Sequence, residues 1–318
     1  MKQCDAQTTI NQNLQPSLPN DKIDSKKAGL FYTILCIAVQ LLGYAVVFLI
    51  NAVMKSETSA FAQIARSYAG CSAQIIILFG VIIFLAVNKT KPTAAGFRKT
   101  DFLPCIIGVL FALSISYSSA PEEFIFQEFL KLFGYEDLNV ISDLPMEGGL
   151  VFLALFAVAL LPAIGEEFMF RGIILEGTKS FGTLQACLIN GFLFSLFHCN
   201  PSQTCYTFLA GAAWALVAIR CNSILPTMIA HFISNGMSIL MLYFGTEAMP
   251  EIALILIYLA AGTATALGLI YFLDYNKSNN VCPSERTAPF WKRATGGVVF
   301  NFAVWILTFV LVITSASV

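Results

Sequence analysis

The chain has 318 residues, of which 57% are hydrophobic and only 12% charged, and its formal net charge is −1. The mean hydropathy of +0.76 lies far above the average of soluble domains. The apolar residues form blocks long enough to cross a hydrocarbon core of roughly 30 Å, so the composition predicts an integral membrane protein. With so few charges, nucleic acid is excluded as a partner. The nine cysteines form no CxxC pair and are expected to be small core residues.

The apolar blocks predict an all-α, polytopic transmembrane helical bundle of about nine spans. Uninterrupted apolar runs without alternation favour helices over a barrel. The expected spans are 29–53, 69–87, 102–120, 149–178, 183–199, 204–221, 223–244, 251–273 and 297–316.

Basic residues are distributed unevenly between the two sides of this topology. The side that carries the amino terminus holds fifteen of the 18 Lys and Arg residues, and the other side holds only Lys55, Arg66 and Lys131. Cytoplasmic connections carry the excess of Lys and Arg. We therefore expect a cytoplasmic amino terminus and an odd number of spans. The third connection, 121–149, is acidic, and its PEEFIFQEFLKLFG stretch has helical periodicity and is expected at the outer surface.

Three ionisable residues lie in the fourth predicted span, in LLPAIGEEFMFRGIIL. Charged side chains at this depth cost roughly 3 kcal/mol each, so they tend to be paired and functional. Glu167 and Arg171 are four residues apart and are expected to form a structural ion pair. Glu166 is rotated by about 100° from Glu167 around the helix, so it has no such partner and is free for chemistry. The alternative interpretation is that Glu166 is a buried, protonated side chain without a catalytic role.

Both histidines of the chain lie in predicted spans. His198 ends the fifth span, four residues after Phe194, and His231 lies in the seventh, four residues before Asn235. If the fourth and fifth helices turn near Gly182, Glu166 and His198 are both 16 residues from the turn. Each then lies roughly 24 Å along its helix from the turn, so the two side chains are at the same height in the membrane. Taken one at a time, such histidines and amides are often only hydrogen-bonding groups between helices.

Together these residues resemble the type II CAAX prenyl proteases and their bacterial relatives linked to bacteriocin processing and immunity, the CPBP or Abi family. The resemblance covers about residues 149–240. Three motifs carry it: EExxxR from Glu166 to Arg171, FxxxH from Phe194 to His198, and HxxxN from His231 to Asn235. Each motif alone is weak, but they occur in order and use every histidine of the chain. The similar stretch PEEFIFQ at 121–127 has no Arg at the motif position and no partner His, and is interpreted as a decoy.

The resemblance implies a division of roles. Glu166 and His198 would activate a water molecule, and His231 and Asn235 would stabilise the oxyanion. Glu167, Arg171 and Phe194 would support them. The family is conventionally described as metalloproteases, and Glu166, His198 and His231 are a plausible Zn²⁺ set. It also resembles a metal-free glutamate mechanism, which we favour slightly because Asn235 would be a poor zinc ligand.

The resemblance also implies a domain organisation. We expect a polar cytoplasmic tail without stable structure at 1–28, amino-terminal transmembrane helices at 29–148 with an acidic connection at 121–148, a CAAX-protease-like catalytic core at 149–244, and carboxy-terminal transmembrane helices at 245–318. The motif-bearing core lies in the fourth, fifth and seventh spans.

The leading functional hypothesis is an intramembrane endopeptidase of the bacterial cell membrane. Its partners would be membrane lipid and a peptide or lipidated protein substrate. A non-catalytic bacteriocin self-immunity or scaffold protein is the alternative. A proton-coupled transporter is disfavoured, because no internal repeat with paired broken helices is apparent.

Overall fold

The computed structural model describes residues 23–136, 144–245, 250–276, 279, 283–284 and 286–315. The predicted tail at 1–28 lies outside this part up to residue 22, and the acidic connection lies outside it for residues 137–143. In chain order the elements are α2 (Ser25–Val53), α3 (Ala60–Ser67), η2 (Ala69–Cys71), α4 (Ser72–Val87), α5 (Phe102–Ser118), α6 (Ala120–Lys131), η3 (Glu147–Gly149), α7 (Leu150–Ala154), η4 (Leu155–Leu160), α8 (Leu161–Glu167), η5 (Phe168–Ile174), α9 (Leu175–Thr178), η6 (Lys179–Phe181), α10 (Thr183–Phe197), η7 (Pro201–Gln203), α11 (Thr204–Cys221), α12 (Leu225–Phe244), α13 (Glu251–Asp274) and α14 (Ala288–Ser315).

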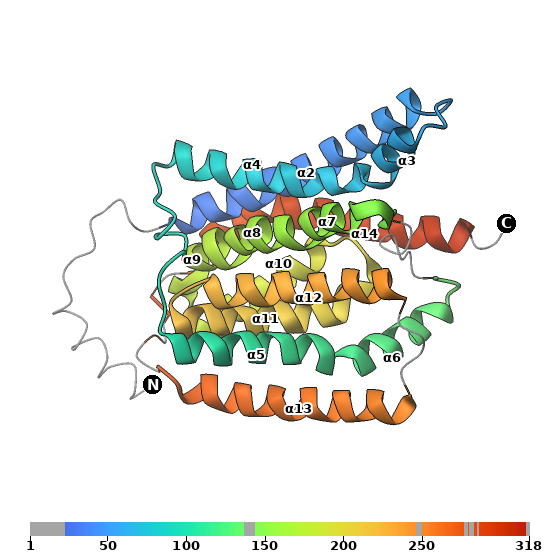
Figure 1. Cartoon of the computed structure of the whole chain (residues 1–318). Helices are drawn as coiled ribbons and strands as arrows, with labels where there is room; N and C mark the ends of the chain where they lie inside the picture. The colour runs from blue at the N-terminus through green and yellow to red at the C-terminus, as the bar shows by residue number, and fades with distance from the viewer. Residues whose placement is uncertain are drawn as a thin grey trace.

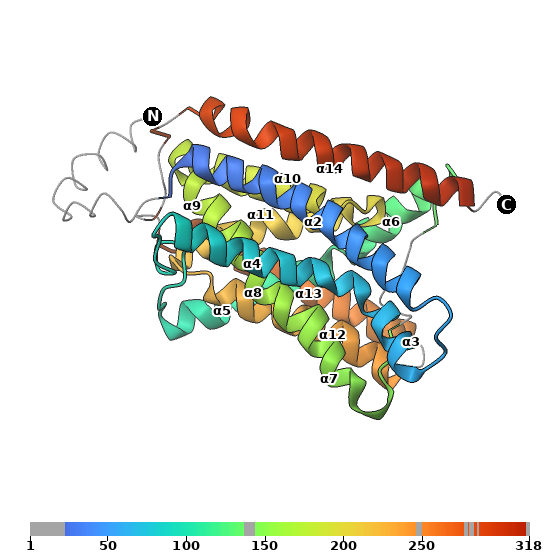
Figure 2. The ribbon, with the colours of Figure 1, turned by 90° about the horizontal axis from the view of Figure 1, so that it is seen from above.

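The predicted polytopic helical bundle is confirmed. Eight helices of the described chain are long and apolar enough to cross a membrane. The long helices run side by side, with the α7–α12 region in the centre, α2 and α4 on one side of it and α5 and α13 on the other (Figure 1). Seen from above, α14 lies along α2 at the edge of the bundle (Figure 2).

The outer surface of the bundle is apolar, as a lipid-facing surface must be. On α13, the side chains of Ile252, Leu256, Leu259, Leu267 and Ile270 are between 59% and 65% exposed. Soluble monomers rarely expose a contiguous apolar surface of this kind. The structure therefore agrees with the composition that the chain is an integral membrane protein.

The fifth predicted span differs from the expectation. Residues 183–199 were expected to cross the membrane, but α10 has only 15 residues and is therefore about 22 Å long. That length falls short of a hydrocarbon core of roughly 30 Å. Helix α10 begins after Gly182, the expected turn residue, whose φ of 98° is accessible to glycine, and it ends at His198, its C-cap residue.

Close packing of α10 against α11 depends on two glycines. A Cβ on Gly191 would lie 2.6 Å from the carbonyl oxygen of Phe208, and a Cβ on Gly211 would lie 2.9 Å from the Cα of Gly191. Small residues let transmembrane helices approach closely, which is how helix pairs associate where no hydrophobic effect drives them together. This contact fixes the position of His198 relative to α11.

Candidate active site

The candidate site is built around a long helix that changes its winding twice. Two π-helical turns, η4 and η5, flank α8, the segment that ends with Glu166 and Glu167. Such π-helical turns often occur at functional sites because the wider winding re-aims the neighbouring side chains. Adjacent residues thus face different surroundings: Glu167 is fully buried, whereas Glu166 is 6% exposed and lines a cavity.

Glu167 contacts both Arg171 and His231. Its Oε1 accepts a hydrogen bond from Nη1 of Arg171 at 2.9 Å and lies 3.0 Å from Nδ1 of His231. The guanidinium of Arg171 also lies 4.3 Å from the centre of the Phe194 ring and 5.1 Å from that of Trp214, close enough for cation–π contact. The predicted Glu167–Arg171 pair is therefore present, and Glu167 has a second contact that its sequence position did not predict.

Glu166 has a partner from a different helix. Nε2 of Gln74, on α4, donates to Oε1 of Glu166 at 2.8 Å. This bond orients the carboxylate and still leaves it lone pairs for a water proton. No sequence motif pointed to Gln74, because it lies 92 residues before Glu166.

The contact of His198 defines which of its ring nitrogens carries a proton. Nδ1 lies 2.7 Å from the carbonyl oxygen of Phe194. A carbonyl oxygen only accepts, so Nδ1 is the donor, and Nε2 of the neutral ring is left with a lone pair. The ring also meets that of Phe194 edge-on at a centroid distance of 4.7 Å. Phe194 thus holds the imidazole through both its backbone and its side chain.

Asn235 lies one turn beyond His231 on α12. Its Nδ2 donates to the carbonyl oxygen of Val158, in the π-helical turn η4, at 2.9 Å. An amide nitrogen carries two hydrogens, so the second remains available to a ligand. The bond ties α12 to the helix that carries Glu166.

A cavity of about 560 Å³ brings the predicted residues together. Its lining includes Glu166, Phe194, His198, His231 and Asn235. Arg171 and Glu167 lie behind this lining, with fully buried side chains. The sequence did not identify three further lining residues: Gln74; Trp214, whose Nε1 donates to the carbonyl oxygen of Ala112 at 3.0 Å; and Glu123, from the stretch interpreted as a decoy.

Within the described ranges, no three His, Cys, Asp or Glu side chains are grouped closely enough to hold a metal ion as they stand. Nδ1 of each histidine is engaged, by Phe194 in one case and by Glu167 in the other, and these contacts leave Nε2 of each ring available. Metal-ligating histidines are held in this way, because they donate their other ring N–H to a carbonyl or a carboxylate. The zinc set of Glu166, His198 and His231 therefore stays a prediction.

The fold and the cavity define the class, a membrane-embedded helical protein with a polar site inside the bundle. Residues 148–237 match the family model described as type II CAAX prenyl endopeptidase Rce1-like. The matched segment is less than a third of the chain, and it contains all three motifs. The match confirms the predicted family resemblance: this segment is similar to the type II CAAX prenyl endopeptidases. Comparisons with curated proteins and with solved structures found no match.

Proposed function

We propose that the chain is an intramembrane endopeptidase that hydrolyses a peptide bond with a water molecule activated by Glu166 and His198. The observation that carries this proposal is the cavity, where side chains from α8, α10 and α12 meet within the family-matched segment. A carboxylate, an imidazole and an amide around one water-accessible space are the groups that amide hydrolysis needs.

The two residues contribute complementary acceptors. Glu166 accepts a proton from the water, and Nε2 of His198 accepts a hydrogen bond from it and orients it. The water oxygen bonds to the scissile carbonyl carbon. Collapse of the tetrahedral intermediate breaks the C–N bond, and Glu166 returns the proton to the leaving nitrogen, giving a carboxyl group and an amine.

His231 and Asn235 are suited to stabilise the oxyanion of that intermediate. The hydrogen bond between Nδ1 of His231 and the carboxylate of Glu167 orients the imidazole, and the second amide hydrogen of Asn235 is available to the oxyanion.

The substrate that this site supports is a membrane-associated peptide or a lipidated protein segment. A bacterial cell membrane is the proposed location. A bacteriocin self-immunity or scaffold role without catalysis is the alternative, and it predicts that the motif side chains are dispensable for function.

The test is peptide-library cleavage by the purified protein and by Glu166→Ala and His198→Ala variants. Glu57→Gln is the matched control, because Glu57 is an exposed carboxylate in the connection after α2. Cleavage by the wild type and the control that is lost in both active-site variants supports the proposal. Full biological function in both variants would indicate the immunity or scaffold role. Lost function without detectable cleavage in the wild type would indicate transport or binding.

A further inference from the structure

The two ends of the bundle differ in charge. One end of the bundle, on the left of Figure 1, is where α2, α5, α10, α12 and α14 begin, and we call it the basic end. The opposite end is formed by the connection after α2, by α3 with η2, and by α6. Arg171 was counted among the fifteen basic residues on the amino-terminal side. Its side chain is fully buried beside Glu167, so it does not belong to either end of the bundle.

Among the described residues, eleven Lys and Arg lie at the basic end, against Lys55, Arg66 and Lys131 at the opposite end. Lys131 is moreover paired with Glu128 at 2.6 Å. The excess of Lys and Arg marks the cytoplasmic side of a membrane protein. By this rule the basic end is cytoplasmic.

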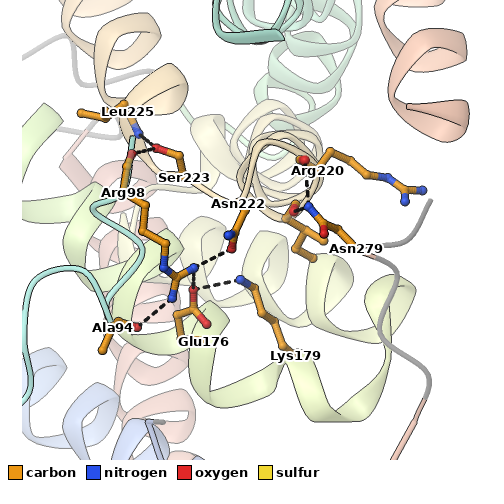
Figure 3. Close-up of polar contacts among 10 residues, drawn as sticks. Ala94, Arg98, Glu176, Lys179, Arg220, Asn222, Ser223, Leu225 and Asn279 are labelled. Atoms are coloured by element: carbon orange, nitrogen blue, oxygen red, sulfur yellow. Dashed lines mark hydrogen bonds and ion pairs between the residues drawn. The ribbon is translucent and has the colours of Figure 1, made fainter. Parts of the chain in front are cut away.

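Polar contacts tie together three connections at the basic end (Figure 3). Arg98, from the connection between α4 and α5, donates to Oε1 of Glu176 at 2.9 Å and to Oδ1 of Asn222 at 2.6 Å. Lys179 donates to the same Glu176 oxygen at 2.9 Å, and Ser223 donates to the carbonyl oxygen of Arg98 at 2.6 Å. These contacts fasten α9 to the α11–α12 turn, and none of these residues lines the active-site cavity.

The cavity lies toward the opposite end. Besides the catalytic groups, it is lined by Gly70 of η2, by Leu144, by Glu123 of α6 and by Gln203 of η7. The first three belong to that end, and Gly70 is exposed. The cavity thus runs from Glu166 to the surface opposite the basic end.

The short helix α10 explains how a polar site reaches this surface. The turn after His198 is held inside the bundle: Nε1 of Trp305 donates to Oγ1 of Thr204 at 3.0 Å. Trp305 lies ten residues before the end of α14 at Ser315, or about 15 Å along the helix. Non-helical backbone is tolerated at such depth where it is covered by protein or lines a water-filled cavity.

We propose that the active-site cavity opens to the non-cytoplasmic side of the membrane and takes its substrate from there. The side of the opening follows from the charge distribution and the position of the cavity. Only the statement that a substrate enters there rests on the proposed function. The substrate class is then a peptide segment at the outer membrane surface, not a carboxy terminus presented from the cytoplasm.

Cysteine labelling tests the side of the opening without requiring any activity. In a full-length variant with the nine native cysteines replaced, Gly70→Cys places a thiol in the cavity mouth, where an added Cβ has no neighbour within 4 Å. Lys91→Cys, exposed at the basic end, is the matched control. A membrane-impermeant maleimide should label the first variant in spheroplasts and the second only in inverted vesicles. The reverse pattern overturns the proposal.

Limited trypsin treatment of the unmutated chain gives an independent reading if the cysteine-free background does not fold. In sealed right-side-out vesicles, cleavage after exposed Lys55 and protection of exposed Lys89 are expected. Cleavage after Lys89 with protection of Lys55 overturns the orientation.

A membrane-impermeant peptide that the purified protein cleaves completes the test. Cleavage dependent on Glu166 should occur in right-side-out vesicles and be reduced more than tenfold in inverted ones. Cleavage confined to inverted vesicles overturns the proposal. Outward labelling of Gly70→Cys without cleavage of any peptide, even by the purified protein, leaves the opening established and rejects the proposed protease function.

Discussion

Substitution of Glu167 by Gln separates two contributions of this carboxylate, to stability and to the orientation of His231. Gln removes the anion that compensates Arg171, whose side chain is fully buried. An uncompensated buried charge costs about 3–5 kcal/mol. Arg171 also makes cation–π contacts with Phe194 and Trp214. These contacts are present in both proteins and do not change the difference, so we expect Glu167→Gln to lower the free energy of unfolding by about 3–5 kcal/mol.

The double variant Glu167→Gln with Arg171→Met removes the unpaired guanidinium as well. Replacement of a buried ion pair by neutral groups of similar volume is often neutral, so stability should return to within about 1 kcal/mol of the wild type. Activity should not return, because His231 still lacks an anionic partner at Nδ1. Loss of one oxyanion donor lowers kcat by about 10²–10³-fold.

The assay combines denaturant unfolding in detergent with peptide cleavage by the same preparations. Glu176→Gln is the control, since it removes the partner of Arg98 and Lys179 at the basic end while leaving the cavity intact. These partly exposed pairs contribute at most about 1 kcal/mol, and kcat should not change. A double variant that regains stability and cleaves at the wild-type rate would refute a role of Glu167 in positioning His231.

Three further predictions address the oxyanion site, the metal and the helix packing. Asn235→Ala should lower kcat by about 10²–10³-fold with little change in KM, and an unchanged kcat would exclude Asn235 as an oxyanion donor. Exhaustive chelation should leave cleavage intact and elemental analysis should find less than one zinc per chain, whereas activity lost on chelation and restored by zinc would contradict the metal-free mechanism. Gly191→Ala should destabilise the protein by about 1–3 kcal/mol, as measured by unfolding. Its control is Gly262→Ala on the exposed face of α13, where an added Cβ has no neighbour within 4 Å. This control should be neutral or slightly stabilising. Equal effects of the two substitutions on stability would refute the close contact of α10 with α11.

Features local to one helix were predictable from the sequence. Apolar run lengths gave the helices, and the four-residue spacing gave the pair of Glu167 and Arg171. The turn at Gly182 was also expected, and Glu166 and His198 on either side of it line one cavity. Run length and spacing depend on helix geometry, in which rise and rotation per residue are nearly fixed. The equal heights calculated for Glu166 and His198 assumed an unbroken α-helix, whereas η5 and η6 lie between Glu166 and Gly182.

Contacts between helices were not predictable, because the rotation of a transmembrane helix leaves little trace in its sequence. Lipid tails and helix interfaces are both apolar, so hydrophobic periodicity does not distinguish the buried face. The contact of Gln74 with Glu166 and that of His231 with Glu167 span 92 and 64 residues of chain. The same limit made Glu123 look like a decoy, although α6 places it in the lining of the cavity.

The short α10 links the fold to the chemistry. A helix long enough to cross the membrane would have continued past His198 and saturated the backbone groups of the following turn, leaving no space there. Because α10 stops at His198, the turn relies on side chains such as Trp305, which donates to the hydroxyl of Thr204, and Tyr135, which donates to Oδ1 of Asn200. Hydrolysis inside a membrane needs water at the scissile bond, and water enters only where the bundle is interrupted and polar. Lengthening α10 should therefore abolish cleavage even with every motif residue in place.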